Sequence, residues 1–249
     1  MRIIINGACG RMGSEVIRLA SEGLRGAQIV CGIDQMAQNK ELGFECFSTF
    51  SEAAGVKADC VIDFSHHSVT ESLLSFCVEE KLPVVVATTG HDEREIETIR
   101  RASEHIPVFF SANMSLGVAL LCELAKTAAK TMPEADIEII EKHHNRKLDA
   151  PSGTALMLAD AISAVRKGAY YVFGRGGQRK REKSEIGIHA IRMGNIVGEH
   201  EVIIGTDTQT ITLKHEAHTR ALFAEGAIAA ADFLVGKPAG LYAMKDIVK

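Results

Sequence analysis

The fold of this chain is decided by the stretch Arg2-Ile3-Ile4-Ile5-Asn6-Gly7-Ala8-Cys9-Gly10-Arg11-Met12-Gly13. Residues 2–6 form a strand-like run, and a helical pattern follows from residue 12 to residue 24. Gly7, Gly10 and Gly13 therefore fall at the turn from strand to helix. The first glycine permits a tight turn, and the other two let phosphate and strand approach the backbone. The helix start offers N–H groups and a positive dipole end, which favour binding of a pyrophosphate.

An acidic residue follows the next predicted strand, at residues 29–33. Asp34 ends this strand, 21 residues after Gly13, where an acid would hydrogen-bond the ribose of an adenine dinucleotide. The loop and the acid together predict a dinucleotide site, whereas the glycines alone are compatible with a simple glycine-rich turn. Gln35 follows Asp34 in place of Arg or Lys, so a 2′-phosphate would meet no adjacent cation. This favours NADH over NADPH, although Lys40 lies close enough in the sequence to keep NADPH open.

The first 115 residues alternate short β-branched runs with helical segments. This alternation is typical of βαβ units and a parallel, doubly wound sheet. Strands are predicted at 2–6, 29–33, 60–64, 83–88 and 107–110, and helices at 12–24, 67–80 and 92–104, the last with an Asp92/Glu95 capping pattern. Two loops of small and hydroxyl residues follow later strands, Ala87-Thr88-Thr89-Gly90 and Ser111-Ala112-Asn113-Met114-Ser115. At the carboxyl ends of parallel strands they suit a cofactor that lies across the sheet edge, though each is also ordinary turn chemistry.

After residue 115 the pattern changes. Helices are predicted at 116–130 and 152–165, among strands at 136–141, 186–192, 200–205 and 208–214. Consecutive strands joined by short turns indicate a mixed or antiparallel sheet, and hence a second domain of α+β type. A last alanine-rich helix at 221–235 resembles the helices of the first half. We therefore expect an α/β protein with a Rossmann-type domain at 1–115, completed by 221–249, and a second domain at 116–220.

The composition excludes several classes of protein. A net charge of −4 argues against general nucleic-acid binding, and the absence of Trp with only 5% aromatic residues argues against a base-stacking surface. No apolar run reaches the roughly 20 residues that span a bilayer. Because the chain starts on a strand with no leader pattern, we expect a cytoplasmic protein without membrane contact. Six scattered cysteines, none in a C-x-x-C pair, favour reduced thiols and predict no metal site.

The densest group of chemically active residues is Glu141-Lys142-His143-His144-Asn145-Arg146-Lys147-Leu148-Asp149-Ala150-Pro151-Ser152-Gly153-Thr154. It follows a strand and leads into a helix for which Ser152 is a suitable N-cap. A helix start beside His and Lys suits an anionic substrate, especially a carboxylate, and both side chains are able to transfer protons. The alternative is a solvated polar loop before a well-capped helix. A zinc site from His143 and His144 is disfavoured because adjacent side chains on a strand point in opposite directions.

The glycine stretch and this cluster together resemble the 4-hydroxy-tetrahydrodipicolinate reductase (dihydrodipicolinate reductase) family. The resemblance continues through Gly187-Ile188-His189, Gly198-Glu199-His200 and Lys237-Pro238-Ala239-Gly240-Leu241-Tyr242, and so spans essentially the whole chain. It implies reduction of 4-hydroxy-tetrahydrodipicolinate, a cyclic dicarboxylate, to tetrahydrodipicolinate by NAD(P)H with loss of water, in lysine and diaminopimelate biosynthesis. It also implies that residues 116–220 bind the substrate and mediate oligomerisation, usually into a homotetramer.

The resemblance implies roles for individual residues. His143 would be the catalytic proton donor or acceptor and Lys147 the proton donor. His144, Gly153 and Thr154 would hold the substrate carboxylates. The residues that would line the cofactor are Gly7, Ala8, Cys9, Gly10, Arg11, Met12, Asp34, Ala87, Thr88, Thr89, Ser111, Ala112, Asn113 and Met114. Many relatives carry a basic residue where this chain has Gln35, so the departure puts a preference for NADPH in question.

Some alternatives stay open. The sequence does not decide which of His143 and Lys147 delivers the decisive proton. The basic loop 175–183 is either a mobile, solvated loop or a lid over an acidic substrate, and Arg220 is either an anion contact or part of a surface salt bridge. The rival functions are another two-domain nicotinamide dehydrogenase, acting on an amino acid such as aspartate, and a non-catalytic NADH sensor.

Overall fold

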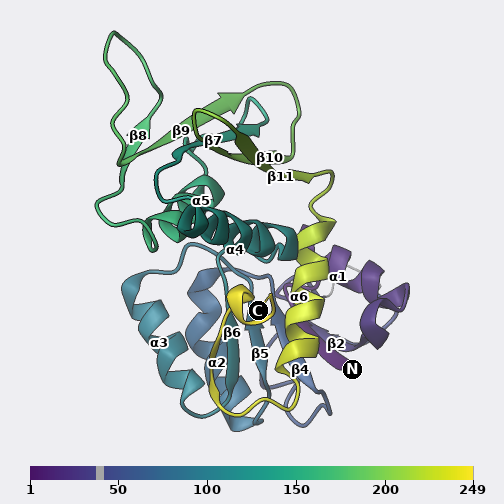
Figure 1. The fold of residues 1–249 in the computed structure, drawn as a ribbon. Helices are drawn as coiled ribbons and strands as arrows, with labels where there is room; N and C mark the ends of the chain where they lie inside the picture. Colours follow the sequence, from purple (N-terminus) through teal and green to yellow (C-terminus); the bar gives the residue numbers. More distant parts are fainter. Residues whose placement is uncertain (38–41, 249) are drawn as a thin grey trace. The chain divides into compact units, whose positions relative to one another are not determined.

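The computed structural model of the chain describes residues 1–37 and 42–248, so Lys40 lies outside the described residues. The chain divides into two compact units (Figure 1). Unit 1 comprises Met1–Ser115 and Ala221–Ile247, and unit 2 comprises Leu116–Arg220. Unit 1 is therefore discontinuous in sequence, whereas unit 2 is a single segment.

Unit 1 contains a parallel sheet that, within the described residues, has seven strands in the order β12-β6-β5-β4-β1-β2-β3. The strands are β1 (Arg2–Asn6), β2 (Gln28–Ile33), β3 (Cys46–Phe47), β4 (Cys60–Asp63), β5 (Val84–Val86), β6 (Pro107–Phe110) and β12 (Gly240–Tyr242). The register pairs Asn6 with both Ile33 and Asp63, and Asp63 with Val86. The carboxyl ends of the central strands are thus level, which places the loops that follow them along one edge.

Helices cover both faces of this sheet (Figure 1). They are α1 (Arg11–Ser21), α2 (Thr70–Glu79), α3 (Glu93–Ser103) and α6 (Ala221–Leu234), with short 3-10 turns at Leu24–Gly26, His67–Val69 and Met244–Asp246. Helices α2 and α3 bury Leu73, Leu74 and Ile99 against β-branched strand residues. On the other face α1 packs against α6, and Phe233 of α6 contacts Phe109 of β6. The prediction of a doubly wound parallel sheet is confirmed.

Unit 2 contains a mixed sheet of five strands in the order β11-β10-β7-β9-β8. Its elements are α4 (Leu116–Thr131), β7 (Asp136–His143), α5 (Gly153–Ser163), β8 (Tyr170–Phe173), β9 (Glu185–Arg192), β10 (Gly198–Gly205) and β11 (Thr210–Ala217). Strand β7 runs parallel to β9 and antiparallel to β10. Burial alternates along β7, so Ile137 and Ile139 face a core that includes Leu158 and Ile162 of α5. The predicted mixed sheet is confirmed.

The differences from the predicted elements lie mainly at edges and ends. The pattern did not predict β3, β8 and β12, which have two, four and three residues. Such short edge strands contain too few residues to display a period. The last strand of unit 2 runs from Thr210 to Ala217 rather than 208–214, because its polar end continues to pair with β10. Asp92 and Glu95 form the predicted capping box of α3.

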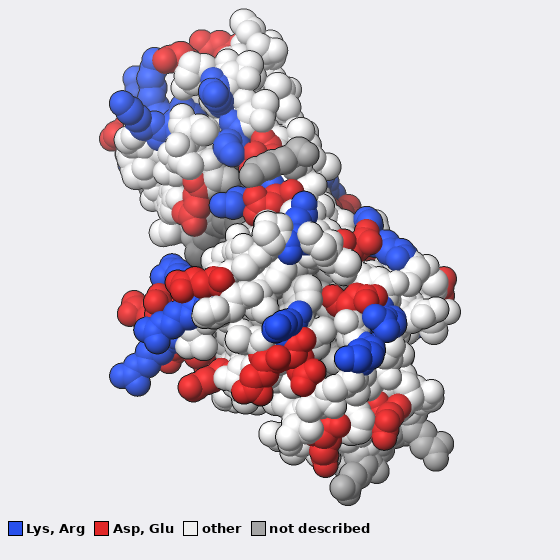
Figure 2. All heavy atoms as spheres, turned by 90° about the horizontal axis from the view of Figure 1, so that it is seen from below, with Lys and Arg blue, Asp and Glu red and all other residues white. Residues whose placement is uncertain are grey.

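The surface carries charges of both signs. On the face that Figure 2 presents, basic and acidic side chains are interspersed rather than gathered into one broad field. Within residues 1–37 and 42–248, no helix combines the length and the apolar character needed to cross a bilayer.

Candidate functional site

The turn after β1 has a backbone that only glycine accommodates at two positions. Gly7 has φ +84°, and a Cβ there would stand 2.7 Å from the carbonyl oxygen of Phe64. A Cβ on Gly13 would stand 2.1 Å from the carbonyl oxygen of Gly7. Gly10 is the N-cap of α1, and its N–H donates to the same Gly7 oxygen at 3.0 Å. The turn and the helix start therefore form a tight cradle suited to a phosphate group.

Asp34 lies beside this cradle, held by backbone hydrogen bonds. Its Oδ2 accepts from the N–H of Cys9 and its Oδ1 from the N–H of Met36, both at 2.9 Å. A pocket of about 480 Å³ opens here, lined among others by Gly7, Gly10, Asp34 and Gln35. Of the described residues that line it, none is Lys or Arg. The pocket thus presents a carboxylate at the position where the sequence predicts an adenosine ribose, and its described lining residues include no Lys or Arg.

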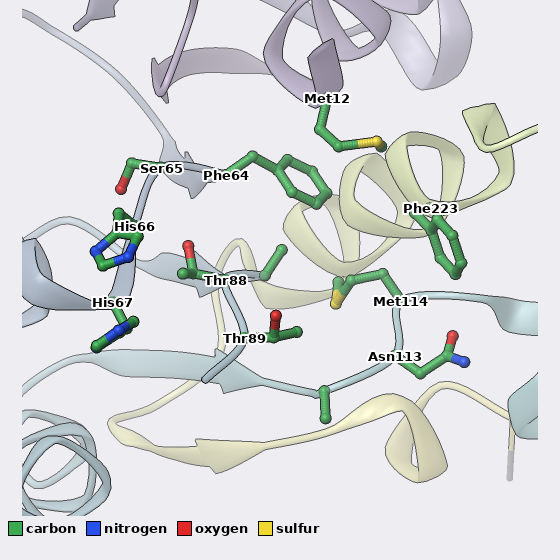
Figure 3. A pocket seen from close by; sticks show the side chains of 12 residues that line it. Met12, Phe64, Ser65, His66, His67, Thr88, Thr89, Asn113, Met114 and Phe223 are labelled. Atoms are coloured by element: carbon green, nitrogen blue, oxygen red, sulfur yellow. The ribbon is translucent and has the colours of Figure 1, made fainter. Parts of the chain in front are cut away.

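A second pocket, of about 430 Å³, adjoins the first and shares Phe64, Ser65 and His66 with it. In Figure 3 the apolar side chains of Phe64 and Phe223 lie toward one end, with His66 and His67 at the other. The predicted cofactor residues that line this pocket are Met12, Ala87, Thr88, Thr89, Ala112, Asn113 and Met114. Together the two pockets follow the carboxyl ends of β1, β2, β4, β5 and β6, where a dinucleotide binds in open α/β sheets.

Four predicted cofactor residues line neither pocket. Ala8 is fully buried, and Cys9 meets Asp34 through its backbone. Arg11 is the exposed first residue of α1. The hydroxyl of Ser111 donates to the carbonyl oxygen of Asn113 at 2.7 Å and so shapes the loop that forms one wall.

In unit 2 the structure gathers the candidate catalytic residues at the end of β7. His143 is buried, and its Nδ1 lies 2.6 Å from Oε2 of Glu141. Arg192 of β9 donates to the same carboxylate from both Nη1 and Nη2 at 2.7 Å, and the N–H of Ser152 donates to it at 3.0 Å. Burial by itself raises the pKa of Glu141, but the hydrogen bonds from His143 and Arg192 outweigh it and bring the pKa to about 2.

The other candidates surround this buried pair. Lys147 follows in the loop, and its Nζ lies 2.9 Å from Oδ1 of Asp149. Burial, and then the nearby cations Arg146 and Arg220, lower the pKa of His144. Helix α5 starts with Gly153 and Thr154, and Ser152 caps it by accepting from the N–H of Ala155 at 3.3 Å. The segment therefore combines a proton-transfer group, cations and a helix start, which suits an anionic substrate.

Comparison with known proteins shows which family the chain belongs to. Two protein-family models match the chain. The model for the N-terminus of dihydrodipicolinate reductase matches residues 1–114, and the model for the C-terminus of dihydrodipicolinate reductase matches residues 117–248. The chain belongs to the dihydrodipicolinate reductase family. Enzymes of this family use a nicotinamide cofactor, so the protein is an oxidoreductase. The Rossmann-type fold of unit 1 is consistent with binding of such a cofactor.

Individual relatives cover the whole chain. The 4-hydroxy-tetrahydrodipicolinate reductase of Caldanaerobacter subterraneus subsp. tengcongensis is 48% identical, over 100% of this chain and 98% of that protein. The enzyme of the same name from Clostridium tetani is 45% identical, over 98% and 95%. A solved structure of dipicolinate-bound dihydrodipicolinate reductase from Paenisporosarcina sp. TG-14 has a TM-score of 0.84 at 24% identity and covers 99% of both chains, which is a likeness of fold.

Asp63, a buried acid beneath the two pockets, was not identified from the sequence. Asp63 ends β4 and is 1% exposed. Its carboxylate accepts hydrogen bonds from Asn6 Nδ2 at 2.7 Å, Ser65 Oγ at 2.5 Å and Thr88 Oγ1 at 2.7 Å. Burial raises the pKa of Asp63. Since Ser65 and Thr88 line a pocket, Asp63 fixes two of its walls, and an acid ending an otherwise apolar strand was the available signal.

Two histidine environments were also missed. Nδ1 of His67, in the wall of the second pocket, lies 2.8 Å from Oε1 of Glu95. The sequence signal for this site was the pair of consecutive histidines after β4. His200 of β10 is buried, lies 3.1 Å from the hydroxyl of Ser152 and contacts His143 edge-on, with ring centroids 5.2 Å apart. Burial, together with His143, lowers the pKa of His200 to about 4, so the ring is neutral at pH 7.

The basic loop 175–183 of this family member is tied to acids of unit 2. Arg175 pairs with Glu185 at 2.6 Å and with Glu138 at 3.1 Å. Arg179 also meets Glu185, Arg181 meets Asp136, and Lys183 meets Glu134. Four of its cations therefore have carboxylate partners within the chain, which favours a structural role for the loop.

Proposed function

We propose that this chain reduces 4-hydroxy-tetrahydrodipicolinate to tetrahydrodipicolinate with NAD(P)H and loss of water, in lysine and diaminopimelate biosynthesis. The observation that carries the proposal is the full-length similarity to proteins of that name, at 48% and 45% identity. The reaction balances as substrate, NAD(P)H and one proton giving tetrahydrodipicolinate, NAD(P)⁺ and water. The residues of both units supply the groups that this chemistry needs.

Unit 1 is proposed to bind the nicotinamide dinucleotide. The glycine cradle would hold the pyrophosphate, and Asp34 would hydrogen-bond the adenosine ribose. The further cofactor residues are those predicted from the sequence, Ala8, Cys9, Arg11, Met12, Ala87, Thr88, Thr89, Ser111, Ala112, Asn113 and Met114. When bound, the nicotinamide supplies a hydride. NADH is the proposed preference, because the pocket at Asp34 and Gln35 has no described cation for a 2′-phosphate.

Unit 2 is proposed to bind the substrate and to supply the proton. His144 and the start of α5 at Gly153 and Thr154 would hold the two carboxylates, supported by the positive surroundings of His144. An arriving hydride displaces an electron pair toward the ring nitrogen, and an acid must then deliver a proton. His143 and Lys147 are the proposed proton-transfer residues. We also propose a cytoplasmic homotetramer in which unit 2 mediates oligomerisation, as the family resemblance implies.

A coupled assay tests the function. The purified protein is supplied with the product of the synthase that condenses pyruvate with aspartate semialdehyde, and oxidation of NADH and NADPH is followed separately. Oxidation that depends on the synthase is the expected result. Oxidation of neither cofactor would refute the reductase activity, and a much higher kcat/KM with NADPH would refute the NADH preference alone. The non-catalytic sensor is favoured instead if His143→Gln and Lys147→Ala leave every measured activity unaltered.

A further inference from the structure

Glu141 has no assigned role in this function, yet its carboxylate is the centre of the unit 2 cluster. The side chain is 0% exposed. Its Oε2 accepts from Nδ1 of His143 and Nη1 of Arg192, and its Oε1 accepts from Nη2 of Arg192 and the N–H of Ser152. An isolated buried charge is strongly unfavourable, whereas one met by several donors is stable. Donors from β7, β9 and the start of α5 thus converge on one ionised group.

These contacts fix which nitrogen of His143 takes part in proton transfer. An ionised carboxylate only accepts hydrogen bonds, so the Nδ1 that lies 2.6 Å from it carries a hydrogen. The proton that His143 gains or loses is therefore on Nε2. A Cβ added at Gly198 would stand 3.1 Å from Nε2 and 3.5 Å from the adjacent ring carbon, so the glycine at this position keeps space beside the reactive atom.

We propose that Glu141 is the positioning residue for His143 and holds its ring so that Nε2 delivers the proton, a role that rests on the proposed function of His143. In this step the Nε2–H bond of the imidazolium breaks. The proton passes to the substrate, where it takes up the electron pair displaced by the hydride. The imidazole is left neutral, with its hydrogen on Nδ1 and still bound to Glu141. The carboxylate stays ionised throughout the transfer and keeps its hydrogen bond to Nδ1.

The groups around the His143 ring determine how its charge responds to the loss of Glu141. The charged and titratable ones are Glu141 and His144 in its own segment, Arg192 on β9, His200 on β10 and Lys147 in the loop after β7. Of these groups, Glu141 is negatively charged, whereas Arg192 and Lys147 are positively charged. Removing the carboxylate therefore removes the negative charge that the ring contacts directly.

The kinetic test compares Glu141→Gln and Glu141→Asp with the unchanged protein. We expect kcat to fall about 100-fold in Glu141→Gln, the usual loss for impaired general acid catalysis. The pH profile of kcat should change, because the variant removes the negative charge beside the reacting ring, and the dissociation constant for NADH should not change. Glu141→Asp, which keeps the charge, should recover part of the activity and the original pH profile. If Glu141→Gln does not fold, Glu141→Gln with Arg192→Gln, which removes both partners of this ion pair, is measured in its place.

Nitrogen NMR of the protein labelled with ¹⁵N-histidine tests the positioning without any turnover. At a pH where the ring is neutral, the His143 signal of the unchanged protein, assigned from the His143→Gln spectrum, should show its hydrogen on Nδ1. The Glu141→Gln variant should show a mixture of the two tautomers. Because this spectrum does not depend on the substrate, it separates failure of the positioning role from failure of the proposed reaction.

Glu138→Gln is the matched control. Glu138 is also on β7, and it pairs with His189 at 2.7 Å and with Arg175 at 3.1 Å, away from His143. This variant should keep the kcat, pH profile and His143 spectrum of the unchanged protein. Equal losses in both Gln variants, or a His143 spectrum in Glu141→Gln that matches the unchanged protein, would overturn the positioning role.

Discussion

The buried His200 predicts that unit 2 loses stability on mild acidification. Its ring is 4% exposed, and Nδ1 has no hydrogen-bond partner among the described residues. Nε2 lies 3.1 Å from the Ser152 hydroxyl, beside the His143 ring. Protonation would therefore place a charge where burial and His143 both oppose it. In the unfolded chain the same histidine is in water and protonates readily.

The magnitude follows from the two pKa values. The folded pKa of His200 is about 4, against about 6.5 for an unfolded histidine. Because the folded pKa is depressed, the contribution to stability is complete above about pH 6.5 and is lost as the pH falls toward about 4. Between pH 7 and pH 5 the loss is about 2 kcal/mol, since the unfolded chain titrates over roughly 1.5 pH units at about 1.4 kcal/mol each.

Urea unfolding of the unchanged protein and of His200→Gln measures this difference. The chain has no Trp and three Tyr, two of which, Tyr170 and Tyr171, lie in unit 2, so tyrosine fluorescence reports mainly on that unit. At fixed protein concentration, the free energy of unfolding should fall by about 2 kcal/mol more in the unchanged protein than in the variant from pH 7 to pH 5. Losses from other histidines are common to both proteins and cancel. Parallel losses in the two proteins would refute the buried neutral state of His200.

Three further substitutions test the two candidate sites. Gly13→Ala brings a methyl group within 2.1 Å of the Gly7 carbonyl oxygen, so NADH binding by calorimetry should weaken at least about 100-fold, and normal affinity would contradict the glycine cradle. Gly198→Ala places a methyl group 3.1 Å from Nε2 of His143, so kcat should fall about tenfold with the NADH dissociation constant unchanged, whereas a loss confined to NADH affinity would argue against this geometry. Gln35→Arg should raise the ratio of kcat/KM for NADPH to that for NADH about tenfold, the value of one charge-assisted hydrogen bond, and an unaltered ratio would place the 2′-phosphate elsewhere.

The parallel sheet was predictable because its signals are local. The run Arg2–Asn6 contains three β-branched isoleucines, and the positive φ of Gly7 and the close approach of Gly13 to the Gly7 carbonyl oxygen both arise within one short segment. The loops at 87–90 and 111–115 follow from strand order, since parallel strands end at one edge. The edge strand β12 has three residues and is a strand only because it pairs with β6. Local periodicity cannot reveal such a strand.

The candidate site was predictable only in part, because its supporting contacts are long-range. His143 and Lys147 were found from their own segment. Glu141 belongs to that segment, but its partner Arg192 is 51 residues away and contacts it only through the register of β7 with β9. His200 reaches the cluster through β10, and nothing in its local sequence indicates that its ring is neutral. Contacts that arise from strand pairing can be identified only when the folded sheet is known.

The discontinuity of unit 1 has a consequence for the order of events during synthesis. Gly226 of α6 passes so close to the loop before α4 that an added Cβ would stand 1.6 Å from the carbonyl oxygen of Met114, and β12 completes the sheet beside β6. Both elements leave the ribosome after all of unit 2. The continuous segment 116–220 is thus able to fold while the nascent dinucleotide-binding half still lacks a helix and an edge strand. Until residues 221–247 arrive, β6 lacks its partner strand and the sheet lacks the cover of α6. An unpaired strand edge of this kind is prone to pair with other chains.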